Sequence, residues 1–392
     1  MKVFVLLSRV PWPLEKGDKL RAYHQIKALS RHHEVHVCCL SHRRPVETEL
    51  AALHDITPHI TVVRLNPIIT FFRLIWGVFS SKPFQVHYFF QWSAARTIRS
   101  LIHSVQPDAV FAQLVRTSEY VKELHHLPKA LDYMDALSAG LRRRADVSPW
   151  WMKWIIQEEQ RRMEAYEHTI FEYFEKHFII SEQDRQCIQH PKRSQIECLP
   201  NGVDTAFFAP QVNHPKNIDL LFTGNMNYAP NVMAAERLVQ RILPKLNQEF
   251  PGIRVLIAGA EPSARVRNLA SSQVEITGWV EDIRDAYHRA RIFIAPMELG
   301  SGLQNKLLEA MSMALPCVTT PLAAGAFRQD AALPCLVGDS DDEVAEHCLN
   351  LLRNEHLCEQ LSSAGRAFVL GHFGWEGATQ PLLDFIAAME VK

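Results

Sequence analysis

The side chains best suited to chemistry lie in one stretch of the sequence, MELGSGLQNKLLEAMSMALPCVTT, at residues 297–320. There Gly300, Ser301 and Gly302 come directly before a segment of helical character. Glycine lets a backbone approach a ligand closely, and the free amides at the start of a helix attract phosphate. This turn therefore predicts a binding site for a diphosphate group.

Two charged side chains follow the turn on the expected helix. Lys306 stands three residues before Glu309, so the two side chains fall close to one helix face. A lysine suits phosphate charge, and a carboxylate can accept two hydrogen bonds from a sugar diol. With the turn, the pair predicts a nucleoside diphosphate whose ribose lies at Glu309. The alternative is an ordinary surface Lys–Glu pair.

Short apolar runs that alternate with helix-like segments must position this stretch. The first half contains KVFVLLS, EVHVCCLS and DAVFAQL, and the second half repeats the rhythm with IDLLFTG, IRVLIAG and RIFIAPM. Continuous apolar strands in strand–helix–strand order are typical of parallel sheets covered on both faces. A turn signal, Pro-Asn-Gly, lies in a linker over residues 198–212. We therefore expect an α/β protein of two Rossmann-like, doubly wound parallel-sheet domains.

Composition and missing motifs narrow the function classes. The 392 residues are 47% apolar and 22% charged with a net formal charge of -1, which suits a globular protein without a field for nucleic acid. No G-x-G-x-x-G follows the first strand of either half, and no G-x-x-x-x-G-K-[ST] occurs. These absences disfavour nicotinamide or flavin binding and P-loop phosphoryl transfer. We expect no nucleic-acid partner.

The cysteines and the first residues indicate the compartment. The eight cysteines contain no C-x-x-C pair and tend to lie in apolar surroundings, as in VHVCCL and ALPCVTT, which is typical of reduced core residues. The start MKVFVLLSRVPWP suits a first buried strand better than a signal peptide. We expect a cytoplasmic protein, with the cytoplasmic face of the inner membrane as the alternative location.

Two apolar segments leave several interpretations open. No segment reaches the ~20 apolar residues of a spanning helix, and the nearest, around residues 68–79, is interrupted by Arg73. It can belong to a domain core, a membrane interface or an acceptor groove. The tryptophan-rich segment 150–156 can pack on the first domain or face a membrane or an acceptor.

An ordered series of motifs resembles a known family. PNGVDTAFFAP, LLFTGNMNYAPN, VLIAGAEP, VEITGWVEDIRDAYHRARIFIAPM and the opening stretch occur in this order. In this order they are similar to the retaining glycosyltransferases of the GT-B fold, family four, also called glycosyl transferases group 1. Near the start, SRVPWPLEKGDKLRAYHQIKALSRHHEVHV resembles the bacterial, exopolysaccharide-associated branch of these sugar transferases.

The resemblance implies an architecture and an activity. It implies an acceptor domain over 1–200, a nucleotide-sugar donor domain over 201–371, and a helix over 372–392 that crosses back to the first domain, with a cleft between the domains. The implied enzyme moves a sugar from a nucleotide-diphosphate sugar to a glycan or lipid-linked acceptor in exopolysaccharide synthesis. Transfer would retain the anomeric configuration and need no metal or cofactor, the nucleotide sugar being a co-substrate.

The resemblance also assigns donor-binding positions. Glu309 matches the second glutamate of the family's Glu-(x)7-Glu motif, which holds the donor ribose, and Lys306 is the candidate cation for phosphate. The other donor-binding positions are Gly224 and Asn225 at a strand end, Trp279 and Val280 beside the base, and Gly300, Gly302, Leu303 and Asn305 around the phosphates.

The first glutamate of that motif is missing. Ser301 stands at its position, and Glu298, three residues earlier, is the candidate replacement near the donor sugar. The predicted catalytic set is therefore Lys306, Glu309, Glu298 and Ser301. The missing carboxylate keeps two rivals open: a sugar-nucleotide epimerase or hydrolase of the same architecture, and a non-catalytic partner in a polysaccharide assembly complex that binds nucleotide sugar.

In the first half, the predicted acceptor and phosphate loop lies between the first strand and the first helix. Gly17 matches the family's glycine-rich loop, where the backbone approaches both substrates, and Asp18 and Arg21 crowd the same turn. Arg21 either contacts a phosphate or acceptor, or is a solvated residue of the first helical turn. In PDAVFAQLVRTSEY, Gln113 and Arg116 occur in the region where many relatives carry a histidine.

Overall fold

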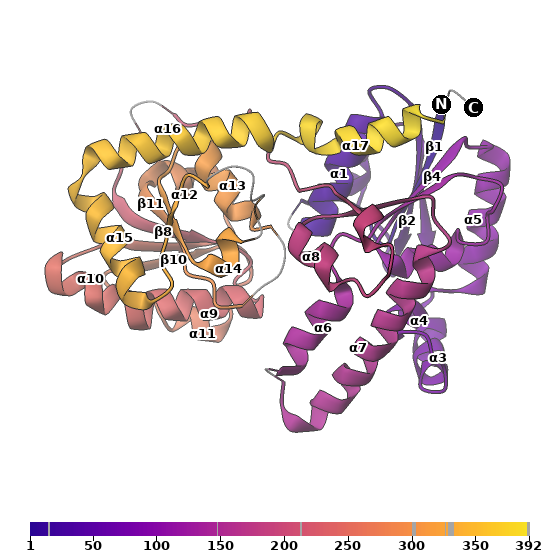
Figure 1. The fold of residues 1–392 in the computed structure, drawn as a ribbon, viewed down its shortest axis with the longest axis horizontal. Coiled ribbons are helices and arrows are strands. Elements are labelled where there is room, and N and C mark those ends of the chain that lie inside the picture. The colour runs from indigo at the N-terminus through magenta and orange to yellow at the C-terminus, as the bar shows by residue number, and fades with distance from the viewer. Residues whose placement is uncertain are drawn as a thin grey trace. The chain divides into compact units, whose positions relative to one another are not determined.

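The computed structural model describes residues 1–14, 16–146, 148–211, 214–299, 303–325, 327 and 333–389. The chain divides into two compact units, Met1–Pro200 with Thr379–Lys392, and Asn201–Ala378. The boundaries expected from the sequence fall after residues 200 and 371. Each unit is built on a parallel sheet with helices packed against it (Figure 1).

The first unit contains a seven-stranded sheet of order β3-β2-β1-β4-β5-β6-β7. Its strands are β1 (Lys2–Leu7), β2 (Glu34–Ser41), β3 (Ile60–Arg64), β4 (Ala109–Gln113), β5 (Lys129–Asp132), β6 (Lys176–Ile179) and β7 (Glu197–Cys198). All neighbouring strands are parallel; Val3, for example, pairs with Val35 and with Ala109. The helices that connect parallel strands lie against the faces of the sheet.

The helices of the first unit follow the same strand–helix alternation. They are α1 (Gly17–Leu29), α2 (Glu47–His54), α3 (Pro67–Gly77), α4 (Phe84–Phe89), α5 (Trp92–Val105), η1 (Val115–Tyr120), α6 (Leu137–Asp146), α7 (Trp150–Phe171), α8 (Glu182–Cys187) and η2 (Arg193–Gln195). The start of α3 shows how the sequence sets such a boundary. The Asn66 side chain accepts a hydrogen bond from the Ile68 amide at 2.9 Å, and Pro67 suits the first turn.

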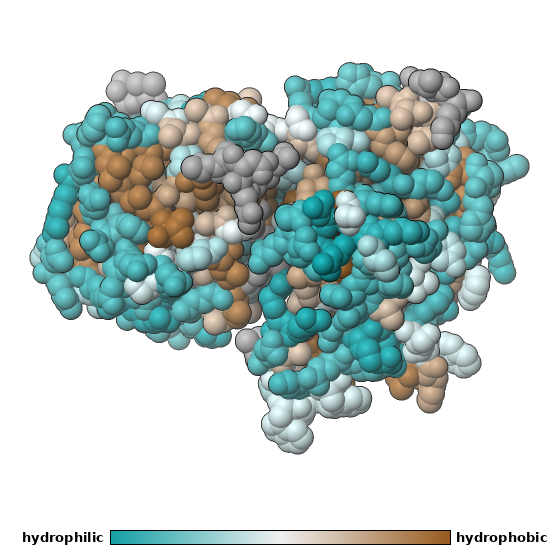
Figure 2. Space-filling model, viewed as in Figure 1, coloured by the Kyte–Doolittle hydropathy of each residue, from teal (hydrophilic) through white to brown (hydrophobic). Residues whose placement is uncertain are grey.

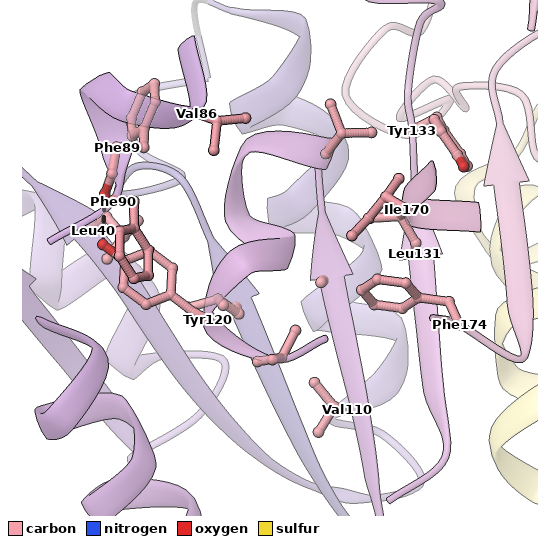
Figure 3. Close-up of a cluster of buried hydrophobic side chains, with 14 of the residues drawn as sticks. Leu40, Val86, Phe89, Phe90, Val110, Tyr120, Leu131, Tyr133, Ile170 and Phe174 are labelled. Atoms are coloured by element: carbon pink, nitrogen blue, oxygen red, sulfur yellow. Dashed lines mark hydrogen bonds between the residues drawn. The ribbon is translucent and has the colours of Figure 1, made fainter. Parts of the chain in front are cut away.

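Two apolar clusters cover the two faces of the first sheet. Alternate residues of β1 divide between them: Phe4 and Leu6 lie in one cluster, whereas Val3, Val5 and Leu7 lie in the other. This alternation is the period of two expected of a strand buried on both faces. Figure 3 shows the first cluster, in which the Tyr120 hydroxyl donates a hydrogen bond to the carbonyl oxygen of Phe89 at 2.5 Å.

The second unit contains a six-stranded sheet of order β10-β9-β8-β11-β12-β13. Its strands are β8 (Ile218–Thr223), β9 (Val255–Ala258), β10 (Val274–Gly278), β11 (Ala290–Ala295), β12 (Cys317–Thr319) and β13 (Leu336–Val337). Its helices are α9 (Ala229–Arg237), η3 (Leu238–Ile242), α10 (Leu243–Glu249), α11 (Ala264–Arg267), α12 (Arg284–Arg289), α13 (Asn305–Ser312), α14 (Pro321–Ala324), α15 (Asp341–Arg353) and α16 (Glu355–His372).

The last helix, α17 (Trp375–Ala387), begins in the second unit and completes the first. Leu382, Phe385 and Ile386 are buried in the same cluster as the side chains of β1. The C-terminal segment is therefore part of the core of the first unit.

The helix α3 exposes an apolar face. Its exposed large side chains are Ile68, Ile69, Phe71, Phe72, Ile75 and Trp76, followed by Val78 and Phe79. Figure 2 shows hydrophobic surface at the end of the first unit where Figure 1 places α3. Within the described residues, no helix has the length and apolar character needed to cross a membrane.

Candidate active site

Backbone contacts between two glycines bring the carboxyl ends of β8 and β9 together. Gly224 and Gly259 follow these strands with φ angles of 154° and 139°. A Cβ atom on Gly259 would lie 1.9 Å from the carbonyl oxygen of Gly224, which no side chain could tolerate. The predicted strand-end residue Gly224 is thus packed against a second glycine whose role the sequence reasoning did not identify.

Lys306 on α13 points to this glycine pair. A Cβ atom on Gly224 would lie 3.3 Å from the Lys306 Nζ atom. Nζ donates a hydrogen bond to Asn231 Oδ1 at 2.5 Å and lies 4.9 Å from the centre of the Phe222 ring. Burial lowers the pKa of Lys306 to about 8, an effect that the charge of Glu309 partly offsets. The lysine is therefore a positioned cation at a strand end.

Glu309, on the same helix, is held by a hydroxyl chain. The Tyr287 hydroxyl donates to Glu309 Oε2 at 2.8 Å and lies 2.9 Å from Thr223 Oγ1. Burial raises the pKa of Glu309, while the Tyr287 hydrogen bond and the Lys306 charge lower it in part. Burial also keeps Tyr287 protonated by raising its pKa well above the ordinary value. Tyr287 therefore fixes the carboxylate, a role that the charged sequence around it, EDIRDAYHRAR, does not indicate.

Of the predicted phosphate-binding positions around the turn, the structure describes Leu303 and Asn305. Asn305 begins α13, and its Oδ1 atom accepts a hydrogen bond from Asn201 at 3.2 Å. Leu303 is buried. Gly300, Ser301 and Gly302 lie outside the described residues, so their predicted roles stay predictions.

The remaining donor-binding positions follow strands β8 and β10. Asn225 follows Gly224, and its Nδ2 atom donates to Glu261 Oε2 at 3.3 Å. Trp279 and Val280 follow β10, and the Trp279 ring is exposed. An exposed ring at a carboxyl strand end is free to stack on a planar group such as a base.

Glu298 has arginines as its partners. Its carboxylate lies 2.9 Å from Arg241 Nη1 and 3.6 Å from Arg237 Nε, and both arginines also pair with Asp341. These side chains line a cavity of about 490 Å³. The described contacts therefore make Glu298 part of an ion-pair network, and its catalytic role remains a prediction.

In the first unit, Gly17 and Asp18 form the start of α1. Gly17 is exposed, and a Cβ atom there would meet nothing within 4 Å. Asp18 Oδ2 lies 3.0 Å from Arg9 Nε and 3.9 Å from Arg116, and the Gln113 amide donates to the Asp18 carbonyl at 3.1 Å. Gln113 and Arg116, which occupy the region where many relatives carry a histidine, therefore both contact Asp18.

The structure corrects the prediction for Arg21. Its side chain is 0% exposed and donates to Asp132 Oδ2 at 2.6 Å and to Oδ1 at 3.2 Å. Gln25, one helical turn later, donates to the same carboxylate at 2.9 Å. Arg21 shares the buried face of α1 with Ala22 and is neither a ligand-facing nor a solvated residue. In the sequence, burial of Arg21 was indicated by its i, i+4 spacing from Gln25 beside apolar positions, which places both on the buried face of the helix.

One group of described residues could hold a metal ion. Glu34, His36 and His59 each offer a ligand atom, all within 4.8 Å of one another. They lie at or beside the amino ends of β2 and β3, whereas the predicted loops follow the carboxyl ends of strands.

Comparison with solved structures defines the class of fold. Sucrose-phosphate synthase from Thermosynechococcus elongatus matches with a TM-score of 0.72 at 15% identity, over 100% of both chains. Anabaena HepE, solved in complex with UDP and glucose, matches with a TM-score of 0.68 at 11% identity, over 98% of this chain and 99% of that one. The protein has the GT-B fold of two Rossmann-like units, as the sequence predicted.

A family model matches most of the second unit. Residues 217–354 match the family model described as glycosyl transferases group 1. Over these residues, which contain Gly224, Lys306 and Glu309, the match confirms the resemblance inferred from the motifs. The exopolysaccharide-associated branch stays a prediction.

Curated relatives match over part of their length. The GDP-mannose-dependent alpha-(1-6)-phosphatidylinositol monomannoside mannosyltransferase of Mycobacterium tuberculosis is 26% identical over 217 residues, which are 49% of this chain and 56% of that protein. The phosphatidyl-myo-inositol mannosyltransferase of the same species is 29% identical over 202 residues, 45% of this chain and 52% of that protein. The chain spans about half the length of the curated relatives it matches.

Proposed function

We propose that the protein is a glycosyltransferase that moves a sugar from a nucleotide-diphosphate sugar to a glycan or lipid-linked acceptor. The observation that carries the proposal is the braced Lys306–Glu309 pair on α13, beside the Gly224–Gly259 contact, inside the region that matches the family model. A cation, a carboxylate and close backbone at strand ends are the groups that a nucleoside diphosphate requires.

The geometry supports a mechanism based on charge stabilisation. Negative charge grows on the diphosphate as the bond to the sugar breaks, and a fixed cation lowers the energy of that transition state. Lys306 is held by Asn231 before any ligand arrives, so little reorganisation is needed. We propose that this cation and the start of α13 take the place of a metal, and that transfer retains the anomeric configuration, as in the resembled family.

The proposed acceptor is part of a bacterial cell-surface or exopolysaccharide glycan. The motifs near the start support this branch, and the curated relatives are named for phosphatidylinositol-linked acceptors, which supports a lipid-borne one. The eight cysteines are all free, which suits a reducing compartment. We therefore place the enzyme at the cytoplasmic face of the membrane.

The exposed face of α3 is the proposed membrane contact. Trp150, Trp151 and Trp154 are also exposed at the start of α7. The preceding helix α6 carries two exposed cations, Arg142 and Arg144, of which Arg142 pairs with Glu164 of α7. Figure 1 shows α3 and the α6–α7 pair projecting from the same end of the first unit. Aromatic rings and arginines are the side chains that favour the interface of an anionic bilayer.

Liposome flotation tests this membrane contact. We expect Trp76→Ser, at a residue 69% exposed on α3, to reduce the fraction bound to anionic liposomes several-fold. The matched control is Trp92→Ser on α5, at a residue 65% exposed, which should leave binding unchanged. Equal loss in both variants, or no binding by the unaltered protein, would remove the membrane contact from the proposal.

Nucleotide binding tests the proposed function itself. UDP, GDP and ADP and their sugars are titrated in the presence of EDTA, by thermal shift and calorimetry. A ligand at a hundred times its dissociation constant adds about 2.7 kcal/mol of stability. Glu309→Ala should abolish this gain, whereas Glu346→Ala, at an exposed residue of α15, should keep it.

The outcomes separate the candidate functions. Failure of every nucleotide to bind would contradict the donor site. Release of free sugar without an acceptor would favour the epimerase or hydrolase, and donor binding without turnover on any acceptor would favour the non-catalytic partner.

A further inference from the structure

Two histidines and a glutamate gather at the amino ends of β2 and β3 in the first unit. Glu34 and His36 lie two residues apart on β2, and His59 immediately precedes β3. Their ligand atoms all lie within 4.8 Å of one another. The predicted acceptor and phosphate loop follows the carboxyl end of β1, so these three residues lie at the opposite end of the strands. Neither the sequence motifs nor the comparisons assign a role to them.

The sheet directs all three side chains to one face. Successive side chains of a strand alternate between the two faces of a sheet. On β2, Cys38 belongs to the apolar cluster of Figure 3, so Glu34 and His36 share that face. On β3, Val63 belongs to the same cluster, and His59 lies four residues before it. The three polar side chains therefore continue one face of the sheet beyond its apolar part.

Backbone hydrogen bonds hold His59 against β2. The Val37 amide donates to the His59 carbonyl at 2.8 Å, and the His59 amide donates to Thr57 Oγ1 at 3.3 Å. The Thr57 hydroxyl in turn donates to the Val35 carbonyl at 2.7 Å. Sites on paired strands hold their ligands more precisely than sites on loops. The sheet therefore fixes the backbone of His59 relative to that of His36.

Both imidazoles turn the same nitrogen toward one carboxylate oxygen. His36 Nε2 lies 2.7 Å and His59 Nε2 lies 3.9 Å from Glu34 Oε1. The two rings are stacked, with centres 4.2 Å apart and planes at 16°. Ligand atoms about 2 Å from a tetrahedral zinc ion lie about 3.3 Å from one another. Changes of about 0.6 Å in the two distances, with a turn of the His59 ring out of the stack, give that spacing.

Charge and exposure allow a metal ion to enter from solution. The His36 hydrogen bond and, to a smaller extent, the charge of Lys2 lower the pKa of Glu34, so its carboxylate is ionised near neutral pH. The side chains of Glu34 and His59 are 44% exposed, and that of His36 is 17% exposed. Lys2, opposite Glu34 in the register of β1 and β2, is a cation that opposes binding. Two imidazoles and a carboxylate nevertheless form a common ligand set for zinc, in which water takes the fourth position.

We propose that Glu34, His36 and His59 bind a zinc ion that cross-links β3 to β2. The strand β3 lies at the edge of the sheet, where it pairs with β2. His36 carries its proton on Nδ1 when Nε2 binds the ion, so its hydrogen bond to Glu34 is exchanged for a bond from each residue to zinc. The ion stabilises the first unit and takes no part in sugar transfer, so the proposal does not rest on the proposed function.

Zinc titration of the metal-free full chain, with a chromophoric chelator as competitor, tests the site. His36→Gln and His59→Asn should each weaken the tightest zinc binding at least tenfold, since even the outer partners of metal ligands are worth about 10–100-fold in affinity. Mg²⁺ should not compete, because it prefers oxygen ligands. Lys2→Gln should strengthen zinc binding, since it removes the opposing charge.

His125→Gln is the matched control. His125 is 69% exposed, and its Nε2 atom lies 3.4 Å from Glu123 Oε2, so it forms a histidine–carboxylate pair outside the three-residue group. This variant should bind zinc as the unaltered protein does. The proposal is overturned if the His36 and His59 variants keep the affinity of the unaltered protein, or if His125→Gln loses as much affinity as they do.

Hydrogen exchange tests whether the ion cross-links the strands. Zinc should slow exchange of the β3 amides several-fold in the unaltered protein and leave it unchanged in His59→Asn. Without zinc, the two proteins should have the same circular dichroism spectrum, because the substituted side chain is largely exposed. Zinc binding that leaves β3 exchange unaltered would overturn the cross-link.

Nucleotide titration with and without zinc separates this proposal from the proposed function. Zinc should leave nucleotide affinity unchanged, and a large change would contradict a purely structural ion. If no nucleotide binds but His36→Gln and His59→Asn still lose zinc affinity, the proposed function fails and the zinc site stands.

Discussion

The carboxyl strand ends of the two units hold their polar groups in different ways. In the second unit, Lys306 and Glu309 are each fixed by a neighbouring side chain, Asn231 and Tyr287. In the first unit, Arg21 is fully buried in an ion pair with Asp132. Arg9 and Arg43 line a pocket of the same unit, where each pairs with one carboxylate. A braced cation and carboxylate suit the fixed charge pattern of the diphosphate proposed as the ligand of the second unit.

The largest effect is expected from Arg21→Met in the first unit. Removing one partner of a buried ion pair leaves the Asp132 carboxylate uncompensated and costs about 3–5 kcal/mol. Chemical denaturation should show this loss, and nucleotide affinity of the surviving folded protein should be unchanged. A stable variant that has lost affinity for a phosphate ligand would show instead that Arg21 belongs to the binding site.

A smaller loss, about 3 kcal/mol, is expected from Gly259→Ala in the second unit, because the new Cβ atom would overlap the Gly224 carbonyl at a positive φ angle. Gly17→Ala is the matched change in the first unit, where the Cβ atom meets open space, and its stability should change by less than about 1 kcal/mol. Thermal unfolding measures both. Similar losses in the two variants would erase the contrast between a tightly packed and an open strand end.

Lys306→Met should lower nucleotide-diphosphate affinity about thirtyfold, through loss of a charge-assisted contact. The effect depends on pH in a defined direction. Because the pKa of Lys306 is about 8, the cation is lost as the pH rises above that value, so affinity should fall between pH 8 and pH 9.5 in the unaltered protein. The methionine variant should show no such fall. A fall of equal size in both proteins would assign the pH dependence to another group.

The smallest effect is expected from Tyr287→Phe, which removes the hydrogen bond that orients Glu309 but leaves the carboxylate in place. Nucleotide affinity should fall about tenfold, since one hydrogen bond to a charged group is lost. Tyr173→Phe, at a tyrosine in the other unit, is the control for calorimetry. An unchanged affinity would show that Glu309 needs no support.

Much of this architecture could be predicted from the sequence. The two parallel sheets followed from apolar strands separated by helices, because a strand buried on both faces has no polar side chain to interrupt it. Lys306 and Glu309 were found because residues three apart share a helix face, a local property. The family motifs gave the strand-end position of Gly224.

The partners of these residues could not be predicted in the same way. Tyr287 and Asn231 contact α13 only because the fold pairs strands that are far apart in the sequence. No local spacing of residues indicates these contacts. Arg21 was misread because its position in the first helical turn fits a phosphate contact, whereas the distant Asp132 decides its burial. Among the described residues the buried Ser8 hydroxyl has no hydrogen-bond partner, which only the packing around β1 reveals.

The path of α17 has a consequence for biosynthesis. Leu382, Phe385 and Ile386 complete the core around β1, yet a ribosome makes them after the whole second unit. An apolar surface of the first unit therefore stays uncovered while the second unit is synthesised and folds. This makes the nascent chain a substrate for chaperones that bind such surfaces. A fragment that stops at Pro200 would keep that surface exposed permanently, so separating the units for biochemistry requires attaching residues 379–389 to the first.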